Sequence, residues 1–242
     1  MRKLFPRDLV VPCKRKGILG GLYWLLYLLG PTAVLLLLLQ FTGIDTGDPE
    51  VLLFLNLCYF AVNFAAIMAI FWNFLCRSFA PIKKFGWFML AIAISYGIYY
   101  TLSLPISMAY EIFRLSPENL NQDAVSAMML QEPLLMGLCT VIFAPVTEEC
   151  LCRGLIFGPL CRKCPWLAYA VSSIVFALLH VLGAIGVSAP LDLILSFLMY
   201  LPAGLALGFA YQRTRSIWAS ILLHAFINLL SFAATYLLQF LA

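Results

Sequence analysis

Long apolar runs separated by short polar segments dominate the chain. Runs of at least the 17–25 residues or so that a helix needs to cross a bilayer lie at 17–41, 51–75, 85–109, 133–159, 166–182, 192–212 and 217–241. Backbone groups inside lipid must bond within their own segment, so each run is predicted to be a helix. The pattern therefore predicts an all-α, polytopic membrane helix bundle with seven transmembrane helices.

Segment 111–132 modifies this count, because within it residues 123–130 have the composition of a short interfacial helix, which would make eight. Gly30-Pro31, Pro105, Pro145 and Pro202 lie inside apolar runs and predict kinks. We find no internal repeat and no linker, so residues 1–242 are expected to form a single integral membrane domain.

The composition agrees with a membrane protein. Hydrophobic residues make up 64% of the chain and charged residues 11%, with a mean hydropathy of +0.98. A soluble domain is typically about 45–50% apolar and about 25% charged. The formal charge of +4 sits in short loops between the runs. It therefore does not indicate a nucleic-acid partner, and membrane lipid is the expected environment.

The distribution of basic residues predicts an orientation. Thirteen of the fifteen Lys and Arg residues fall on one side of the seven-helix arrangement, before the first run and after the second, fourth and sixth. Loops on the other side are acidic, with Arg114 as their single base. By the positive-inside rule the N-terminus is cytoplasmic and the C-terminus lies outside. The first run lacks a clear small-residue cleavage site and is expected to be a retained span.

The eight cysteines are scattered, and most lie in apolar runs, where cysteine behaves as a small hydrophobe. Cys161 and Cys164 form a lone CxxC motif. A structural zinc site needs a second pair of ligands. A metal role for this motif is therefore disfavoured.

Two adjacent carboxylates, Glu148 and Glu149, lie in the run 133–159. Placing a charged side chain inside a membrane costs on the order of several kcal/mol of free energy unless the charge is paired or hydrated. Arg153 follows Glu149 by four residues, on the same helical face, and predicts an ion pair that holds Glu149. Glu148 is rotated by about 100° from Glu149. It is left free to act as a general base.

The two histidines, His180 and His224, lie in later runs, and each has a partner four residues away, Phe176 or Asn228. His180 is expected to orient the water that Glu148 deprotonates, with Phe176 packed on its ring. His224 and Asn228 offer hydrogen-bond donors to a developing oxyanion. Together these residue types suit hydrolysis by an activated water.

The same residue types also suit a metal. Glu148, His180 and His224 make a sufficient ligand set for catalytic zinc, with water in the fourth position. No HExxH motif is present, so these ligands would converge from three helices. A proton- or metal-coupled transporter could use buried Glu and His as relays. It would also predict repeats in the two halves of the chain, which we do not find.

At these positions the chain resembles the CPBP family of intramembrane proteases, which contains the type II CAAX prenyl endopeptidases and the bacterial Abi-type proteins. The family motifs EExxxR, FxxxH and HxxxN match 148–153, 176–180 and 224–228 in order, and the resemblance covers residues 133–230, the expected catalytic core. The resemblance implies a conical bundle of about eight helices and peptide-bond hydrolysis by Glu148 and His180. His224 and Asn228 would form the oxyanion hole, with Glu149 and Arg153 as support. It implies either no cofactor or Zn²⁺, because the family has been described both ways.

The short loops favour the bacterial members of that family, which are linked to pheromone and bacteriocin maturation. The expected substrate is a membrane-associated or lipidated peptide, such as a pheromone or bacteriocin precursor or a CAAX-like protein. The expected location is a bacterial plasma membrane. The alternative is a catalytically silent immunity or scaffold protein of the same family.

Overall fold

Helices make up nearly all of the described chain. The computed structural model describes residues 6, 8–42, 48–115 and 118–241, leaving out the side chains of 29–36, 38–42, 81, 83 and 238–241, and these residues contain no strand. The elements before the fourth apolar run are α1 (Lys14–Thr42), α2 (Pro49–Arg77), the 3-10 turn η1 (Ala80–Lys83), α3 (Phe85–Phe113) and α4 (Leu120–Gln131). The later ones are α5 (Pro133–Leu138), η2 (Cys139–Phe143), α6 (Ala144–Glu149), η3 (Cys150–Phe157), α7 (Gly158–Lys163), α8 (Pro165–Val181), η4 (Leu182–Ala184), α9 (Pro190–Thr214) and α10 (Ile217–Leu241).

Six of these helices are long and apolar enough to cross a membrane. Their bounds are Pro49–Arg77, Phe85–Phe113, Pro133–Lys163, Pro165–Ala184, Pro190–Thr214 and Ile217–Leu237. They correspond to the predicted runs from 51–75 onward, so the all-α membrane bundle is confirmed and the chain is an integral membrane protein. The first predicted run, 17–41, lies within α1, where many side chains lie outside the described residues. A seventh span therefore stays a prediction.

The fourth apolar run folds as one continuous helix, Pro133–Lys163, that changes its winding twice. The stretches η2 and η3 are π-helical, and they flank the short α6 that carries the glutamate pair. Pro145 is the second residue of α6 and has no N–H to donate. π-Helical turns are rare and frequently mark functional sites. The disturbance predicted at Pro145 thus takes the form of widened turns on either side of α6.

The segment 111–132 does contain a further helix, α4, which begins where Asn119 Oδ1 accepts a hydrogen bond from the Gln122 backbone N–H at 3.2 Å. Side-chain caps of this kind stabilise a helix start. The twelve residues of α4 extend only about 18 Å at 1.5 Å per residue, too short for a hydrocarbon core of about 30 Å. It packs instead against α5, α8 and α10.

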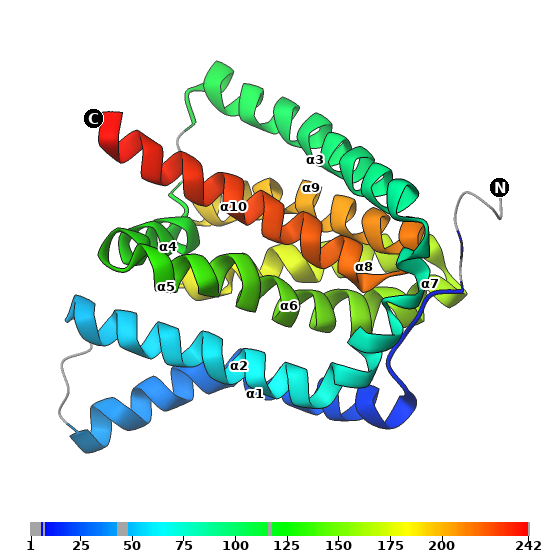
Figure 1. Cartoon of the computed structure of the whole chain (residues 1–242). Coiled ribbons are helices and arrows are strands. Elements are labelled where there is room, and N and C mark those ends of the chain that lie inside the picture. The colour runs from blue at the N-terminus through cyan, green and yellow to red at the C-terminus, as the bar shows by residue number, and fades with distance from the viewer. Residues whose placement is uncertain (1–5, 7, 43–47, 116–117, 242) are drawn as a thin grey trace.

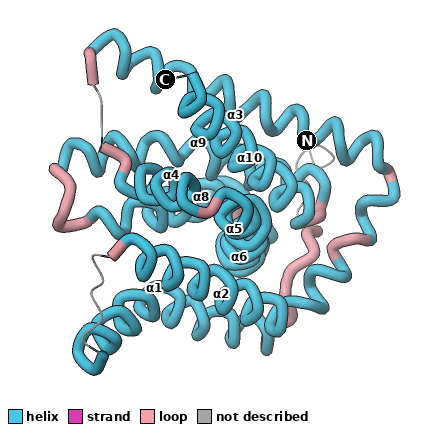
Figure 2. The backbone as a smooth tube through the Cα atoms, turned by 60° about the vertical axis from the view of Figure 1, so that its left-hand side comes forward, coloured by secondary structure: helices cyan, strands magenta, loops and turns pink. Residues whose placement is uncertain are grey.

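The fourth-run helix and α8 occupy the centre of the bundle, with α1 and α2 on one side and α3, α9 and α10 on the other (Figure 2). The helices lie close together where α7 ends and α10 begins, and they diverge toward the end where α4 lies (Figure 1). The larger apolar core is at the close end and includes Phe74, Phe157, Tyr211 and Ile217, all nearly fully buried. The diverging end has a small cluster around Met129 and Met136.

Helix α9 approaches α8 and η3 closely through two glycines spaced four residues apart. A Cβ added to Gly204 would lie 2.8 Å from the Ser173 Cα, and one added to Gly208 would lie 2.8 Å from the Phe157 ring. Small residues at this spacing let membrane helices pack backbone against backbone. This contact positions the backbone of α9 against the buried residues of the site.

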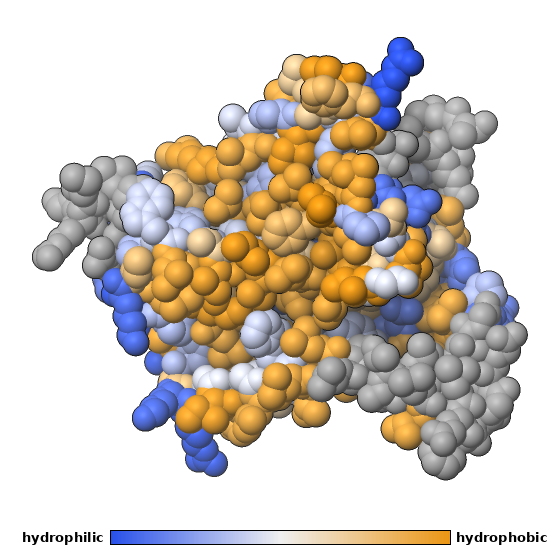
Figure 3. Space-filling model, turned by 180° about the vertical axis from the view of Figure 1, so that it is seen from behind, coloured by the Kyte–Doolittle hydropathy of each residue, from blue (hydrophilic) through white to orange (hydrophobic). Residues whose placement is uncertain are grey.

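The outer surface is mainly apolar. Large exposed hydrophobic side chains lie on every membrane-spanning helix, among them Phe54, Leu90, Leu135, Leu178 and Leu222. Figure 3 shows apolar side chains over most of one face, with hydrophilic residues toward its margins. Such a surface suits contact with lipid rather than water.

Candidate active site

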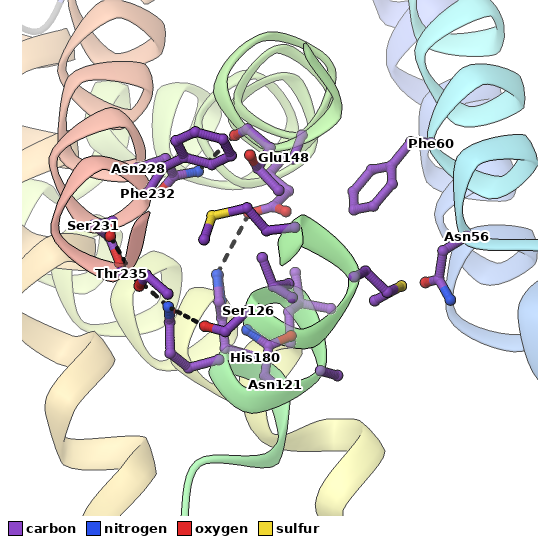
Figure 4. Close-up of a pocket in the computed structure, with 18 of the residues that line it drawn as sticks. Asn56, Phe60, Asn121, Ser126, Glu148, His180, Asn228, Ser231, Phe232 and Thr235 are labelled. Carbon is purple, nitrogen blue, oxygen red and sulfur yellow. Dashed lines mark hydrogen bonds and ion pairs between the residues drawn. The ribbon is translucent and has the colours of Figure 1, made fainter. Parts of the chain in front are cut away.

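Three side chains that are far apart in the sequence meet inside the bundle: Glu148 from α6, His180 from α8 and His224 from α10. Glu148 Oε2 lies 3.7 Å from His180 Nε2 and 3.9 Å from His224 Nε2. Figure 4 shows Glu148 and His180 directed toward each other from opposite sides of the cavity. One oxygen of Glu148 thus faces both imidazoles, at distances slightly too long for hydrogen bonds.

The neighbouring Glu149 is fully buried and bonded on both of its oxygens. Its Oε1 accepts from Arg153 Nη1 and from His224 Nδ1, each at 3.0 Å. Its Oε2 accepts from the Ser220 hydroxyl. The ion pair that the spacing of four residues predicts is therefore present, and Glu149 also anchors one of the two histidines.

Arg153 is itself buried and is fixed from three directions. Besides Glu149, it donates from Nη2 to the Gly204 carbonyl oxygen at 2.9 Å, and its guanidinium lies 4.7 Å from the centre of the Phe176 ring. The Phe176 ring also packs against both histidines, at 4.5 Å from His180 and 5.4 Å from His224. The packing of Phe176 on His180 that the sequence predicts is present, and the same ring also contacts His224 and Arg153.

The hydrogen bonds of the two rings determine which of their nitrogens carry protons. His180 Nδ1 lies 2.8 Å from the Phe176 carbonyl oxygen, and His224 Nδ1 bonds the Glu149 carboxylate. A carbonyl and an ionised carboxylate only accept hydrogen bonds, so each Nδ1 must be the donor. In a neutral ring Nε2 then presents a lone pair. Both of these Nε2 atoms face Glu148.

Lone pairs therefore converge on one point without a hydrogen between them. Glu148 Oε2 is buried and, among the described residues, has no hydrogen-bond partner. The carboxylate oxygen and the two Nε2 atoms all lie within 4.8 Å of one another. Buried acceptors normally have a hydrogen-bond partner, because leaving the hydrogen bond unmade costs about 1–3 kcal/mol. A water molecule that donates to them, or a cation, is the kind of occupant that this arrangement suits.

Asn228, one turn beyond His224, lies at the same cavity (Figure 4). Its Nδ2 donates to the Thr140 carbonyl oxygen in η2 at 2.8 Å, which leaves it one further amide hydrogen. The sequence predicts a shared donor pair from His224 and Asn228. In the structure Asn228 can donate to a substrate directly, whereas the donor of neutral His224 is already used by Glu149.

Two cavities meet at these residues. One of about 290 Å³ is lined by Glu148, His180, the α4 residues and the start of α2. The other, of about 530 Å³, is lined by His180, His224 and side chains of α3, α9 and α10. The residues that line both are Gln122, His180, Tyr200, Asn228 and Ser231. The candidate site thus opens to cavities large enough for several side chains of a peptide.

Sequence reasoning missed several residues of the site. The Tyr200 ring stacks on His180 with centroids 4.3 Å apart, and its hydroxyl bonds Asn119 and Asn121 beside α4. A tyrosine in an apolar run carries no spacing signal, so only the fold reveals it. Ser220 had such a signal, because it precedes His224 by four residues on the same face of α10.

Only one group of three or more His, Cys, Asp or Glu side chains in the described part of the chain lies close enough to hold a metal ion, namely Glu148, His180 and His224. Cys161 and Cys164 of the CxxC motif do not belong to this group. Both imidazoles of the group donate from Nδ1 to an oxygen, the second-sphere contact typical of metal-binding histidines.

The segment that contains the site residues matches a known protein family. Residues 130–230 match the family model described as "Type II CAAX prenyl endopeptidase Rce1-like". The resemblance inferred from the three motifs is therefore confirmed over that segment, which contains Glu148, His180 and His224. No solved structure shows a significant match.

Two curated bacterial relatives match over parts of their length. The "Putative membrane peptidase YdiL" of Bacillus subtilis is 29% identical over 123 residues, which are 50% of this chain and 46% of the relative. The "UPF0177 protein YbdJ" of Lactococcus lactis is 33% identical over 99 residues, 41% of this chain and 38% of the relative. The matched segments thus span less than half of either relative.

Proposed function

We propose that this chain, which matches the type II CAAX prenyl endopeptidase family over residues 130–230, is an intramembrane peptidase that hydrolyses a peptide bond with a water bound at Glu148, His180 and His224. The observation that carries the proposal is the convergence of the unpartnered Glu148 oxygen and two Nε2 atoms at the edge of two cavities. A merely structural histidine pair would have its polar atoms bonded to protein groups.

In the proposed reaction Glu148 is the general base. A water between the three groups gives one hydrogen bond to Glu148 and the other to His180 Nε2, so its oxygen lone pair is directed away from both. Glu148 takes the first proton as the oxygen bonds to the carbonyl carbon of the substrate. When the tetrahedral intermediate breaks its C–N bond, that proton passes to the leaving amine nitrogen.

Asn228 supplies the oxyanion contact in this proposal. Its second amide hydrogen points from a side chain already held by the Thr140 carbonyl, so donating it requires no rearrangement. His224 donates to the same oxygen only when Nε2 carries a proton. Glu149 and Arg153 hold His224 and the local helix in place from the buried side.

A zinc ion also fits the donor set. Ligand atoms of tetrahedral zinc bonded at 2.0–2.1 Å lie about 3.4 Å apart, close to the 3.7 and 3.9 Å between Glu148 and the two histidines. Glu148, His180 and His224 would hold the ion, and a bound zinc would lower the pKa of a water in its open position. Both mechanisms use the same three residues, so a chelator rather than a substitution separates them.

The substrate proposed is a membrane-associated or lipidated peptide, such as a bacterial pheromone or bacteriocin precursor, and the proposed location is a bacterial plasma membrane. Both named relatives come from bacteria, and one of them carries the name of a membrane peptidase. The apolar surface and the position of the site inside the bundle restrict access to segments that can enter a membrane.

The test compares the purified protein with Glu148→Gln in detergent on a library of fluorogenic lipopeptides. The substitution preserves the size and polarity of the side chain, but an amide cannot accept the proton, and loss of a general base typically costs about 10²–10⁴-fold in rate. We expect the variant to lose activity by that factor. Hydrolysis by neither protein would count against a peptidase and favour a silent immunity or scaffold protein. Equal hydrolysis by both would show that Glu148 is not the base.

Treatment with a chelator distinguishes the two mechanisms in the same assay. Loss of hydrolysis on chelation, restored by Zn²⁺ but not by Mg²⁺, identifies the metal route. Hydrolysis that survives chelation identifies Glu148 as the base acting on water without a metal. His180→Ala and His224→Ala should be inactive on either route.

A further inference from the structure

The two ends of the bundle carry opposite charge. Among the described residues, ten basic residues and one acidic residue, Asp8, belong to the end where α2, α7 and α9 terminate. The described residues at the other end include seven acidic ones and a single basic one, Arg114. A bias this large in short loops sets the orientation of a membrane protein whatever the number of its spans. The positive-inside rule therefore predicts that the basic end is cytoplasmic.

Contacts in the structure show that the basic ends of separate helices do meet. Arg77 at the end of α2 and Arg162 in α7 donate to the backbone carbonyl oxygens of Val11 and Leu9, at 3.1 and 2.6 Å. Arg215 after α9 pairs with Asp8 at 2.8 Å. One N-terminal segment thus joins three helix ends that the sequence places on the same side.

This basic end closes the candidate site from the cytoplasm. Three fully buried residues lie between the converging side chains of the candidate site and the basic end: Glu149, Arg153 and Ser220. Beyond them, side chains of four elements are also fully buried, among them Phe157 in η3, Cys161 in α7, Tyr211 in α9 and Ile217 in α10. Close packing of these described side chains leaves no room for a water path between them.

The cavities extend in the other direction. The smaller cavity is lined by Asn121, Gln122 and Ser126 of α4. This helix lies in the acidic connection between α3 and α5. On α10, His224 is about 10 Å from the basic end at 1.5 Å per residue, whereas Thr235, also lining the cavity, is about 27 Å from it. The helices diverge toward this same end (Figure 1).

We propose that the site is entered from the non-cytoplasmic side of the membrane, past α4. This inference rests on the proposed peptidase function. The substrate is then a peptide segment that has already crossed the membrane or emerges from its outer face, not a prenylated tail presented in the cytoplasm. Polar α4 side chains would receive the extended backbone of such a segment: Gln122 already bonds Ser126 within α4 and Ser231 of α10 across the cavity.

Cysteine accessibility tests the direction of entry. The background variant replaces the four exposed cysteines, Cys13, Cys58, Cys76 and Cys164, with serine, and the remaining four are buried. Single cysteines are then introduced as Ala124→Cys on α4 and Ser231→Cys inside the cavity. The matched control keeps the native Cys164, next to Lys163 at the basic end. The probe is a sulfonated maleimide applied to spheroplasts and to inverted vesicles.

We expect A124C and S231C to react in spheroplasts about tenfold or more faster than in inverted vesicles, since a charged reagent does not cross hydrocarbon. Cys164 should show the reverse. Reaction of Cys164 in spheroplasts overturns the orientation. Reaction of S231C only in inverted vesicles, or in neither preparation, overturns entry past α4.

The outcome is separable from that of the peptidase assay. Labelling that follows the expected pattern while neither wild type nor E148Q hydrolyses any lipopeptide would leave the entry route intact and remove the peptidase. Labelling from the basic side together with Glu148-dependent hydrolysis would leave the peptidase intact and remove the entry route. With both upheld, modification of S231C in spheroplasts should block hydrolysis of a peptide added outside.

Discussion

Two adjacent glutamates of identical chemistry have different surroundings, and the difference defines the candidate site. Glu149 is fully buried with partners on both oxygens, whereas Glu148 is 15% exposed at its side chain and faces two imidazole lone pairs. One helical residue, about 100° of rotation, separates a carboxylate that holds the structure from one that is available to a substrate.

The first prediction concerns this division. Glu149→Gln leaves the Arg153 charge buried without a counter-ion, and breaking a buried pair in this way costs about 3–5 kcal/mol. It also weakens the bond to His224 Nδ1. We expect a clearly lower midpoint of thermal unfolding in detergent, followed by tryptophan fluorescence, together with loss of hydrolysis.

Glu148→Gln is the matched control, because it makes the same chemical change one residue away. Glu148 has no hydrogen bond to lose on Oε2, so its unfolding midpoint should shift by less than the equivalent of about 0.5 kcal/mol. Equal destabilisation by the two substitutions would show that the carboxylates do not have separate roles.

At the scale of elements, two backbone features bring the site residues together. The π-helical turns η2 and η3 flank the glutamate pair, and the glycine contact between α8 and α9 brings the Gly204 carbonyl to Arg153. The π-helical turns interrupt the uniform winding of a regular α-helix. The glycine contact removes the side chains that would otherwise separate the two backbones.

The second prediction is that Gly204→Ala disturbs both stability and catalysis. The new methyl group would meet the Ser173 backbone at 2.8 Å, and overpacking of this kind costs about 1–3 kcal/mol. Because the two helices must separate, the Gly204–Arg153 hydrogen bond should weaken and the hydrolysis rate should fall. Unfolding midpoint and rate are measured on the same preparations.

Gly97→Ala on α3 provides the comparison, since nothing lies within 4 Å of its added Cβ. Alanine is favoured over glycine in a helix by about 1 kcal/mol, so this variant should be as stable as the wild type or slightly more so. If the unfolding midpoint of G204A also equals that of the wild type, the α8–α9 contact tolerates expansion.

At the scale of the whole molecule, the segment that matches the family is not self-contained. Phe71 on α2 is fully buried and belongs to one apolar cluster with Cys150 and Leu151 of η3. A Cβ added to Gly20 of α1 would collide with the Phe71 ring. Helices outside residues 130–230 therefore support the back of the helix that carries Glu148.

The third prediction follows from this packing. Phe71→Ala removes a fully buried ring, a change that costs about 3–5 kcal/mol in a close-packed core. We expect the unfolding midpoint and the hydrolysis rate to fall together, because the cavity forms directly behind η3. Val62→Ala on the same helix is 66% exposed and should change neither. Loss of stability with an unchanged rate at low temperature would show that α2 does not support the site.

The sequence predicted the bundle because the membrane allows few alternatives. Backbone groups in lipid have to bond within a helix, so apolar runs from 51–75 onward identified six membrane helices directly. Spacing of four residues likewise predicted the Glu149–Arg153 pair, since both partners lie on one helix. The short helix in 111–132 was expected as well, although its polar side chains gave no indication that they line the cavity.

Contacts between helices could not be predicted in this way. The pairing of His224 with Glu149, the stacking of Tyr200 on His180 and the bond from Asn228 to Thr140 join residues on different elements. Helical periodicity fixes which way a side chain points from its own axis, but not which other helix lies there. The sequence by itself determined the helices and the residues with chemistry. Only the tertiary structure decided that their lone pairs converge, because crossing angles and the glycine contact set the distances.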